Sequence, residues 1–189
     1  MKKRCCFLFF LLLLGAIALV GCGENGSGKK TINVGTNAEF PPFEYMNNEG
    51  EIDGFDMAVI KAIAEEKGYD VKFTNMEFKS LPASLKTGAL DVVAAGMTIT
   101  EDRKKNVDFS NGYYEANQCI IVRKDSKIAN FSDLEGKSIA VQEGTTGDLM
   151  VTPGAEDSKL KKASVKRFKK GSDAIIELKN AGVDAMSLS

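Results

Sequence analysis

Apolar and polar positions near the start of the folded region follow first a strand pattern and then a helix pattern. Residues 31–35 predict a strand, and Pro41 and Pro42 prevent its continuation, so residues 37–40 are expected in a loop at its carboxyl end. From Gly54 onward, apolar side chains recur at helical spacing until Gly68, which is typical of a helix stop. This predicts an amphipathic helix after the loop.

The period then changes again. Tyr69, Val71 and Phe73 alternate as in a strand, Pro82 suits the first turn of a second helix, and residues 90–95 form an apolar run typical of a buried strand. The first unit therefore has the predicted order β-α-β-α-β.

A second unit follows a strand predicted at residues 118–122. Its expected features are a short helix capped by Ser132, a strand at 138–142, a loop at 144–147 with a helix from Asp148, a strand at 165–168, and a helix at 173–180 capped by Ser172.

The two units share a stretch of sequence. LKTGALDV at residues 85–92 matches LKNAGVDA at residues 178–185, and both stretches lead from a helix end into a buried strand. Because the match falls at the same place in each unit, we expect an α/β protein of two similar lobes.

The amino terminus has the pattern of an export signal. MKKR precedes an apolar run at residues 7–20, which is too short for a membrane span of about 20 residues. LVGC at residues 19–22 is similar to a bacterial lipobox, so we expect a signal peptide at 1–21, lipidation of Cys22 and a flexible tether at 22–30. The alternative is an ordinary signal peptide with an incidental cysteine.

Composition narrows the chemistry. Without residues 1–21, which hold three of the 25 Lys and Arg and none of the 26 Asp and Glu, the formal charge is 22 minus 26, or −4. This gives no basic surplus for nucleic acid. The absence of histidine, with Cys119 as the one cysteine inside the folded region, argues against a Zn or Cu site and against His-based nucleophile triads. We expect no metal and no cofactor.

The candidate site lies in the loops after the strands, where open α/β sheets bind ligands. Arg103, in the stretch GMTITEDR at residues 96–103, offers a planar fork that matches a carboxylate. It could instead pair with Glu101 or Asp102, and Thr100 could be only a helix cap. Phe40 and Phe78 suit either a ligand pocket or the core.

Several ordered motifs resemble one family. NAEFPPFEY (37–45), GFD (54–56), AGMTITEDR (95–103), VDFS (107–110) and VQEGTTG (141–147) are similar to the polar amino-acid-binding proteins of ABC importers, extracellular solute-binding family 3. The resemblance covers residues 31–185. It implies the type II periplasmic-binding-protein fold, in which two lobes joined by a hinge close on the ligand.

The resemblance also implies site roles. Arg103 would bind the ligand α-carboxylate, helped by Thr98, by the backbone at Gly96, and by Thr145 or Thr146 of the other lobe. The remaining expected ligand-binding residues are Phe40 and Phe78, which would enclose the aliphatic side chain, and Asn37 and Gln142, which would select it. Glu39 could add an acid that suits arginine or lysine.

The resemblance implies lobe 1 at residues 31–118 and lobe 2 at 119–189, with relatives continuing further. We therefore expect lobe 2 to be incomplete. Ser189 stands where relatives commonly carry an aspartate for the ligand α-amino group, so this chain is expected to bind amino acids weakly or not at all.

The expected function is that of a non-enzymatic, substrate-binding lipoprotein of an ABC amino-acid importer. It would be monomeric, lipid-anchored outside the cytoplasmic membrane or periplasmic, and would deliver a polar or basic amino acid to the permease. The alternatives are a carboxylate-dependent, dehydratase-like enzyme on the same fold and a receptor sensor module.

Overall fold

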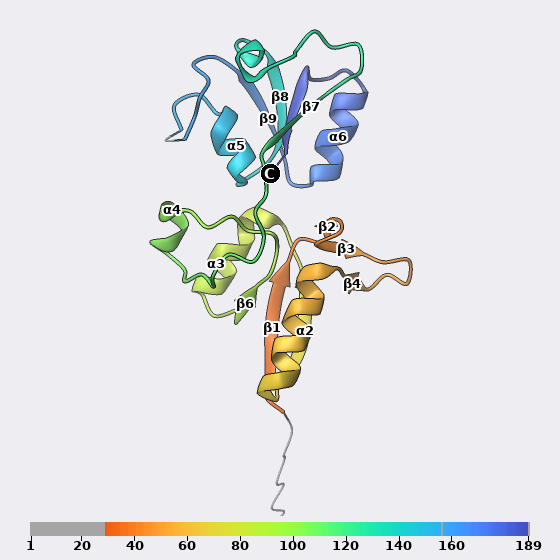
Figure 1. The fold of residues 1–189 in the computed structure, drawn as a ribbon, viewed down its shortest axis with the longest axis vertical. Helices are drawn as coiled ribbons and strands as arrows, with labels where there is room; N and C mark the ends of the chain where they lie inside the picture. Colours follow the sequence, from red (N-terminus) through yellow and green to blue (C-terminus); the bar gives the residue numbers. More distant parts are fainter. Residues whose placement is uncertain (1–28, 156, 189) are drawn as a thin grey trace, which may run out of the picture.

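The computed structural model describes residues 29–155 and 157–188. The leader, Cys22 and Ser189 lie outside these residues. Two α/β lobes are stacked along the long axis of the molecule and joined by the segment between α4 and β7 (Figure 1). We call the part from β1 to α4 the first lobe and the part from β7 to β10 the second lobe.

The first lobe is built around a parallel sheet of order β5-β1-β6, with a small antiparallel sheet β2-β3-β4 beside it. The helices α2 and α3 contribute to separate hydrophobic clusters. Residues of α2 pack with Val34 of β1, and residues of α3 pack with Leu90, which precedes β6. The elements are β1 (Thr31–Thr36), β2 (Glu39–Phe40), β3 (Glu44–Met46), β4 (Ile52–Asp53), α2 (Phe55–Lys67), β5 (Asp70–Asn75), η1 (Phe78–Ser80), α3 (Leu81–Lys86), β6 (Val92–Val93) and α4 (Glu101–Lys104).

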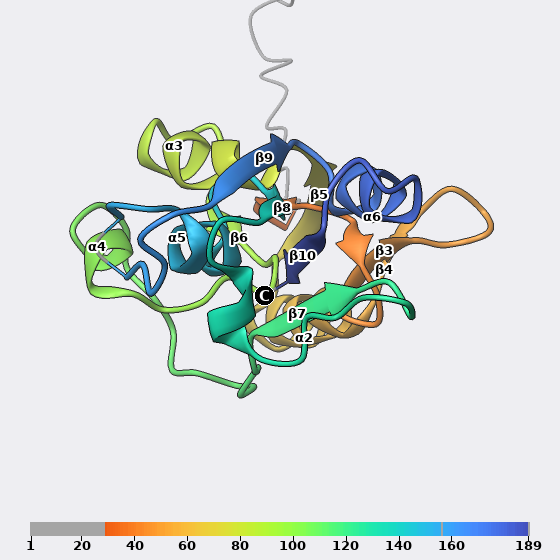
Figure 2. The same cartoon turned by 90° about the horizontal axis from the view of Figure 1, so that it is seen from above.

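The second lobe has a four-stranded sheet of order β7-β10-β8-β9, in which β7 runs antiparallel to β10. Helices α5 and α6 lie on opposite sides of it (Figures 1 and 2), each over its own buried apolar cluster. The elements are β7 (Cys119–Val122), η2 (Phe131–Leu134), β8 (Ser138–Gln142), α5 (Thr146–Val151), β9 (Ser164–Phe168), α6 (Gly171–Lys179) and β10 (Ala185–Leu188).

The internal repeat is visible in the sheets. Strand order β5-β1-β6 in the first lobe has the same connectivity as β9-β8-β10 in the second. Asp91 Oδ2 accepts the backbone N–H of Asn33 at 2.8 Å, and Asp184 Oδ2 accepts that of Ser138 at the same distance. The aspartate just before β6 therefore holds the matching strand β1 of its sheet, and the aspartate just before β10 holds the start of β8. The two-lobed α/β expectation is confirmed.

Glycines set both ends of α2. Gly68 ends the helix in the left-handed conformation, with φ 76° and ψ 31°. Gly54 precedes the helix with φ 131°, and a Cβ there would collide with the carbonyl oxygen of Phe43. The hairpin and the start of α2 can approach this closely because residue 54 has no side chain.

Several predicted boundaries are wrong in detail. Strand β6 covers only Val92–Val93, because the chain leaves the sheet before Gly96. Residues 39–40 are not loop but the short strand β2, which pairs with β3 across the Pro-Pro turn.

One predicted cap and one predicted helix start are also wrong. Asn130, not Ser132, caps η2, because its side chain accepts the N–H of Ser132 and Asp133 completes the capping box. Helix α5 begins at Thr146, two residues before Asp148.

Helix α6 begins at Gly171 without a side-chain cap, so Ser172 is not its cap either. The Ser172 hydroxyl instead donates to Glu39 of the first lobe at 3.2 Å.

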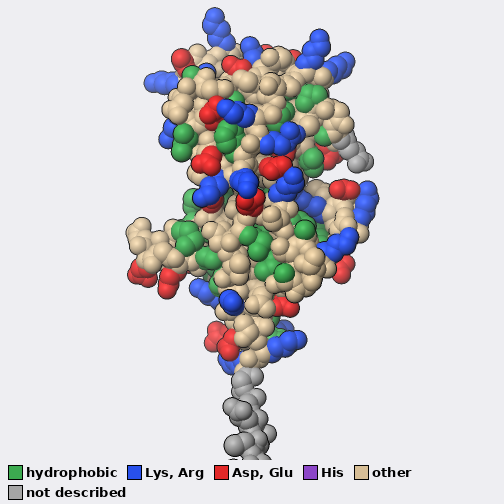
Figure 3. Space-filling model, turned by 180° about the vertical axis from the view of Figure 1, so that it is seen from behind, with side chains coloured by type: hydrophobic (Ala, Val, Ile, Leu, Met, Phe, Trp, Pro, Cys, Tyr) green, Lys and Arg blue, Asp and Glu red, His purple; other side chains and the backbone are tan. Residues whose placement is uncertain are grey.

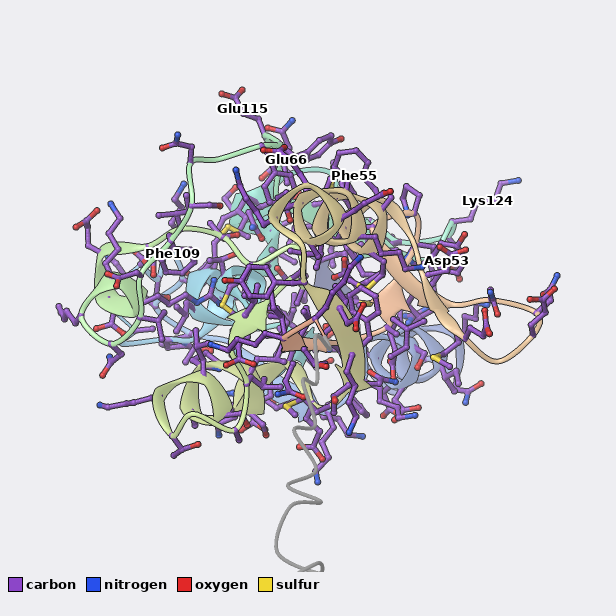
Figure 4. All side chains as sticks on the ribbon, turned by 90° about the horizontal axis from the view of Figure 1, so that it is seen from below. Asp53, Phe55, Glu66, Phe109, Glu115 and Lys124 are labelled. Atoms are coloured by element: carbon purple, nitrogen blue, oxygen red, sulfur yellow. The ribbon has the colours of Figure 1, made fainter. Side chains whose placement is uncertain are left out.

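The segment that joins the lobes passes beside the first residue of α2. Tyr113 packs against Phe55, with ring centroids 6.1 Å apart, and Tyr114 meets Phe43 at 4.8 Å. Figure 4 shows Phe55 and Glu115 on the same side of the molecule as α2. The aromatic contacts fix the path of this segment before the chain enters β7.

Candidate functional site

A pocket between the lobes brings together all nine residues that the sequence analysis assigned to ligand binding. They are Asn37, Phe40, Phe78, Gly96, Thr98, Arg103, Gln142, Thr145 and Thr146. Four further residues line the same pocket: Glu44, Ala95, Ser187 and Leu188. The ligand-binding roles of the nine residues stay predictions, but their convergence is a property of the fold.

Arg103 is held in place by both lobes. Its Nη1 donates to the Thr98 carbonyl at 2.7 Å and its Nη2 to the Gly144 carbonyl across the cleft at 2.9 Å. The guanidinium carbon lies 5.5 Å from the centre of the Phe78 ring, a cation–π arrangement. Burial lowers the pKa of Arg103 and Asp102 opposes the shift. The group stays cationic, since arginine is not deprotonated in proteins.

The alternative partners of Arg103 are occupied elsewhere. Glu101 pairs with Lys104 at 2.8 Å, and Asp102 pairs with Lys105 at 3.1 Å, both on the exposed side of α4. Thr100 is the cap of this helix, since its hydroxyl accepts the N–H of Arg103 at 3.2 Å. The helix thus keeps its acids on the surface while Arg103 is turned into the cleft.

The threonines of the second lobe differ in their contacts. Thr145 caps α5 by accepting the N–H of Asp148 and donates its hydroxyl proton to the Gln142 carbonyl. Thr146 lies 3.5 Å from the Thr98 hydroxyl of the first lobe and accepts a hydrogen bond from Gln118 at 2.9 Å. Thr146 therefore connects both lobes and the joining segment.

Asn37 and Gln142 face each other across the cleft. Gln142 Nε2 donates to Asn37 Oδ1 at 2.8 Å, while the Asn37 amide donates to the Met76 carbonyl at 2.9 Å. Both amides are oriented by these contacts, and they close one edge of the pocket.

The two aromatic residues line the pocket and also pack into the lobe. Phe78 is 9% exposed and belongs to the cluster of Leu81, Leu90 and Ala95, while Phe40 stacks on Phe43 at 5.8 Å. Core packing and pocket wall are therefore not exclusive alternatives for these rings.

Sequence reasoning missed the acid of the pocket. Glu44 lines it and is 2% exposed, next to the equally buried Asp56 of α2. Asp56 Oδ2 accepts the N–H of Gly96 at 2.9 Å and so holds the backbone of the loop after β6. Burial, and then the neighbouring Asp56, raise the pKa of Glu44 to about 9. The only signal was the position of Glu44 inside the NAEFPPFEY motif.

Glu39, the acid proposed from sequence, has other partners. Its carboxylate accepts from Ser172 and lies 3.5 Å from the Lys170 ammonium, both at the start of α6. Glu39 is not among the residues that line the pocket.

An ion pair between the buried Asp148 and the exposed Arg167 supports the loop before α5. Asp148 is 5% exposed; it accepts the N–H of Gly144 at 3.1 Å and binds the Arg167 guanidinium at 3.1 Å. The carbonyl of Gly144 is the one that receives Arg103. Asp148 and Arg167 thereby position the contact between the lobes.

Ion pairs also bridge the lobes at the rim of the cleft. Lys79 binds Glu143 at 2.7 Å, and Glu77 binds Lys169 at 2.7 Å. Seen from behind, lysine and acidic side chains gather where the two lobes meet (Figure 3). These exposed pairs add a screened attraction between the lobes.

Among the residues that the structure describes, no three His, Cys, Asp or Glu side chains form a group able to hold a metal ion. Within the same residues, no helix is both long and apolar enough to cross a membrane.

Comparison with known proteins gives a consistent picture. The family model "Bacterial extracellular solute-binding proteins, family 3" matches residues 32–189. The arginine-binding extracellular protein ArtP of Bacillus subtilis (strain 168) is 44% identical over 144 residues, covering 72% of this chain and 56% of ArtP. The chain thus spans little more than half the length of that relative.

Solved structures agree with the fold. Holo ArgBP from T. maritima is 46% identical with a TM-score of 0.77, over 84% of this chain and 68% of that one. An ancestral arginine-binding protein bound to glutamine is 42% identical with a TM-score of 0.75, over 85% of this chain and 69% of that one.

Proposed function

The chain belongs to the bacterial extracellular solute-binding proteins of family 3, and from that membership we propose that it captures a free polar or basic L-amino acid between its two lobes. The captured amino acid is delivered to the membrane permease of an ABC importer. The named relatives support this ligand class, since one is an arginine-binding protein and another was solved with glutamine.

The observation that carries the proposal is the arrangement of Arg103. Its guanidinium is permanently charged, lies over the Phe78 ring and donates to one carbonyl of each lobe. It can therefore bind the ligand α-carboxylate and, at the same time, hold the two lobes together. Thr98 and Thr146 lie beside it as hydroxyl donors. This combination supports recognition of an amino acid better than recognition of a neutral solute.

Selection of the side chain falls to the other polar residues of the pocket. Glu44 bounds the space above Gly96, where its Oε1 would be 3.5 Å from a Cβ on that glycine, with the Phe40 ring at 3.8 Å. Asn37 and Gln142 add amide groups at the rim. An acid between aromatic walls favours a ligand with a cationic side chain, and the amides favour a polar one.

We also propose that Cys22 is lipidated and that residues 22–30 tether the lobes to the outer face of the cytoplasmic membrane, with the protein acting as a monomer. The lipobox-like LVGC supports lipidation of Cys22. Labelling cells with an alkyne-bearing fatty acid should tag the wild-type protein and not Cys22→Ala. Equal labelling of both would refute the anchor.

Thermal-shift screening of the purified protein against the standard amino acids tests the function. A ligand that binds only the folded state stabilises it and so raises Tm. At a ligand concentration of a hundred times Kd, the free energy of unfolding rises by about 2.7 kcal/mol. We expect arginine, lysine, histidine or glutamine to give the largest shifts and acidic amino acids none. The expectation of weak or no binding, drawn from Ser189, stays a prediction that the same screen tests. Absence of a shift with every amino acid, confirmed by calorimetry, would bear it out and refute amino-acid capture by this chain.

A further inference from the structure

Two adjacent buried carboxyl groups, Glu44 of the pocket lining and Asp56 behind it, form no ion pair with any described residue. Glu44 is 2% exposed and Asp56 is 1% exposed. Among the described residues, Oε2 of Glu44 and Oδ1 of Asp56 receive no hydrogen bond, and neither residue forms an ion pair. Buried charges are normally paired, so this arrangement is unusual for a structural pair.

Among the described residues, no cation is paired with either carboxyl group. Glu44 in β3 faces Asp56 from α2, and Tyr113 from the joining segment lies near both carboxyls. Burial, then a side-chain hydrogen bond to Asp56 and the charges of Asp56 and Glu44, raise the pKa of the Tyr113 hydroxyl, so it stays neutral. The cation of the pocket, Arg103, is bound to the carbonyls of Thr98 and Gly144.

Two adjacent buried carboxylates without a cation cannot both be ionised. The pair therefore holds one proton in the ligand-free protein. Asp56 accepts the N–H of Gly96 at 2.9 Å, which stabilises its ionised form, so Glu44 is the member that keeps the proton. The pKa of Glu44, raised to about 9, agrees with this. Glu44 is also the member of the pair that lines the ligand pocket.

We propose that a ligand with a cationic side chain is bound by the ionised form of Glu44, and that its binding releases one proton from the Glu44–Asp56 pair to solvent. The inference rests on the proposed capture of an amino acid in this cleft. The balance is simple: the Glu44 carboxylic acid gives its proton to the buffer, and the ligand cation takes its place beside the carboxylate.

Proton release couples affinity to pH. Below the pKa of Glu44, a cationic ligand must displace the proton, so its Kd falls about tenfold for each unit of rising pH. A neutral ligand of the same shape displaces nothing and binds with a Kd that does not depend on pH. The pocket therefore distinguishes a cation from its neutral isostere more sharply at higher pH.

Isothermal titration calorimetry of the unmodified protein tests the inference directly. Arginine and its neutral isostere citrulline are titrated at one pH in phosphate and in Tris, whose different ionisation enthalpies report the number of protons exchanged. We expect arginine to release about one proton and citrulline none.

The variant Glu44→Gln provides the second measurement, with the exposed Glu49→Gln in the same hairpin as a matched control. Glu44→Gln should bind arginine about 10- to 150-fold more weakly and without proton release, because an amide cannot neutralise a buried cation. Glu49→Gln should behave as wild type.

Each other outcome decides against the inference. Arginine binding without proton exchange would overturn it while leaving amino-acid capture intact. Proton release by both ligands would show that the α-ammonium, not the side chain, meets Glu44. Binding of neither arginine nor any other amino acid would refute the proposed function, and the inference with it.

Discussion

Replacing Arg103 by lysine keeps the positive charge but removes the planar guanidinium, so the variant separates the two contributions. Lysine keeps the cation but can reproduce only one of the two contacts that Arg103 makes with the carbonyls of Thr98 and Gly144, and it cannot stack on Phe78 in the same way. The carboxylate of a bound amino acid also loses its second parallel hydrogen bond. One charge-assisted hydrogen bond is worth about 1.5–3 kcal/mol when lost.

That loss corresponds to a Kd raised about 10- to 150-fold. Calorimetry with each amino acid that binds should show a similar factor for all of them, since every ligand carries the same α-carboxylate. Agmatine, which is arginine without that carboxylate, should be affected far less. The difference between arginine and agmatine gives the share of the loss that belongs to the carboxylate.

Arg123 provides the matched control. It also donates to two backbone carbonyls, those of Leu178 and Val183, but it lies outside the cleft. Arg123→Lys should lower the stability of the fold by about 1 kcal/mol and leave Kd unchanged. The reasoning is refuted if Arg103→Lys shifts Kd no more than Arg123→Lys, or weakens the binding of one ligand only.

Three further changes test other parts of the structure. Glu44→Gln should flatten the pH dependence of the unfolding free energy by about 1.4 kcal/mol per unit. The stabilisation that the proton on Glu44 gives is full below the unfolded value of 4.5 and declines as pH rises to about 9, so urea titrations between these limits report it. Gly54→Ala should cost at least about 2 kcal/mol in the same assay, because φ 131° and the Phe43 carbonyl exclude a Cβ. Lys169→Glu should weaken ligand binding about two- to fivefold at low salt; adding Glu77→Lys should restore it, and about 1 M NaCl should remove the difference.

The sequence predicted most elements because periodicity reports which side of a segment is buried. Strand β8 lies at Ser138–Gln142 as expected, and α2 ends at Gly68. Caps were less predictable, since Asn130 and Ser132 both have a side chain that can accept an N–H, and the backbone geometry of the turn decides between them.

The buried acid of the pocket escaped prediction for a physical reason. In the stretch Phe43-Glu44-Tyr45 the aromatic residues alternate with the acid, a pattern that predicts the acid on the solvent side. In β3 the inward face is the one that carries Glu44, which is buried while Tyr45 is only half-buried. The face is chosen by contacts with Asp56 and Gly96, which follow later in the chain, so no local pattern contains the information.

The two lobes contribute different kinds of residue to the pocket, and this difference explains which parts of the site could be predicted from the sequence. Among the described residues that line the pocket, the charged ones, Glu44 and Arg103, both come from the first lobe, whereas the second lobe contributes uncharged groups such as Gln142 and Thr146. A charge can be recognised residue by residue, and Arg103 was. The contribution of the second lobe is mainly one of position, since the Gly144 carbonyl and the Gln142 amide matter only when the lobes meet. That arrangement is a property of two folded lobes together, and it becomes visible only in three dimensions.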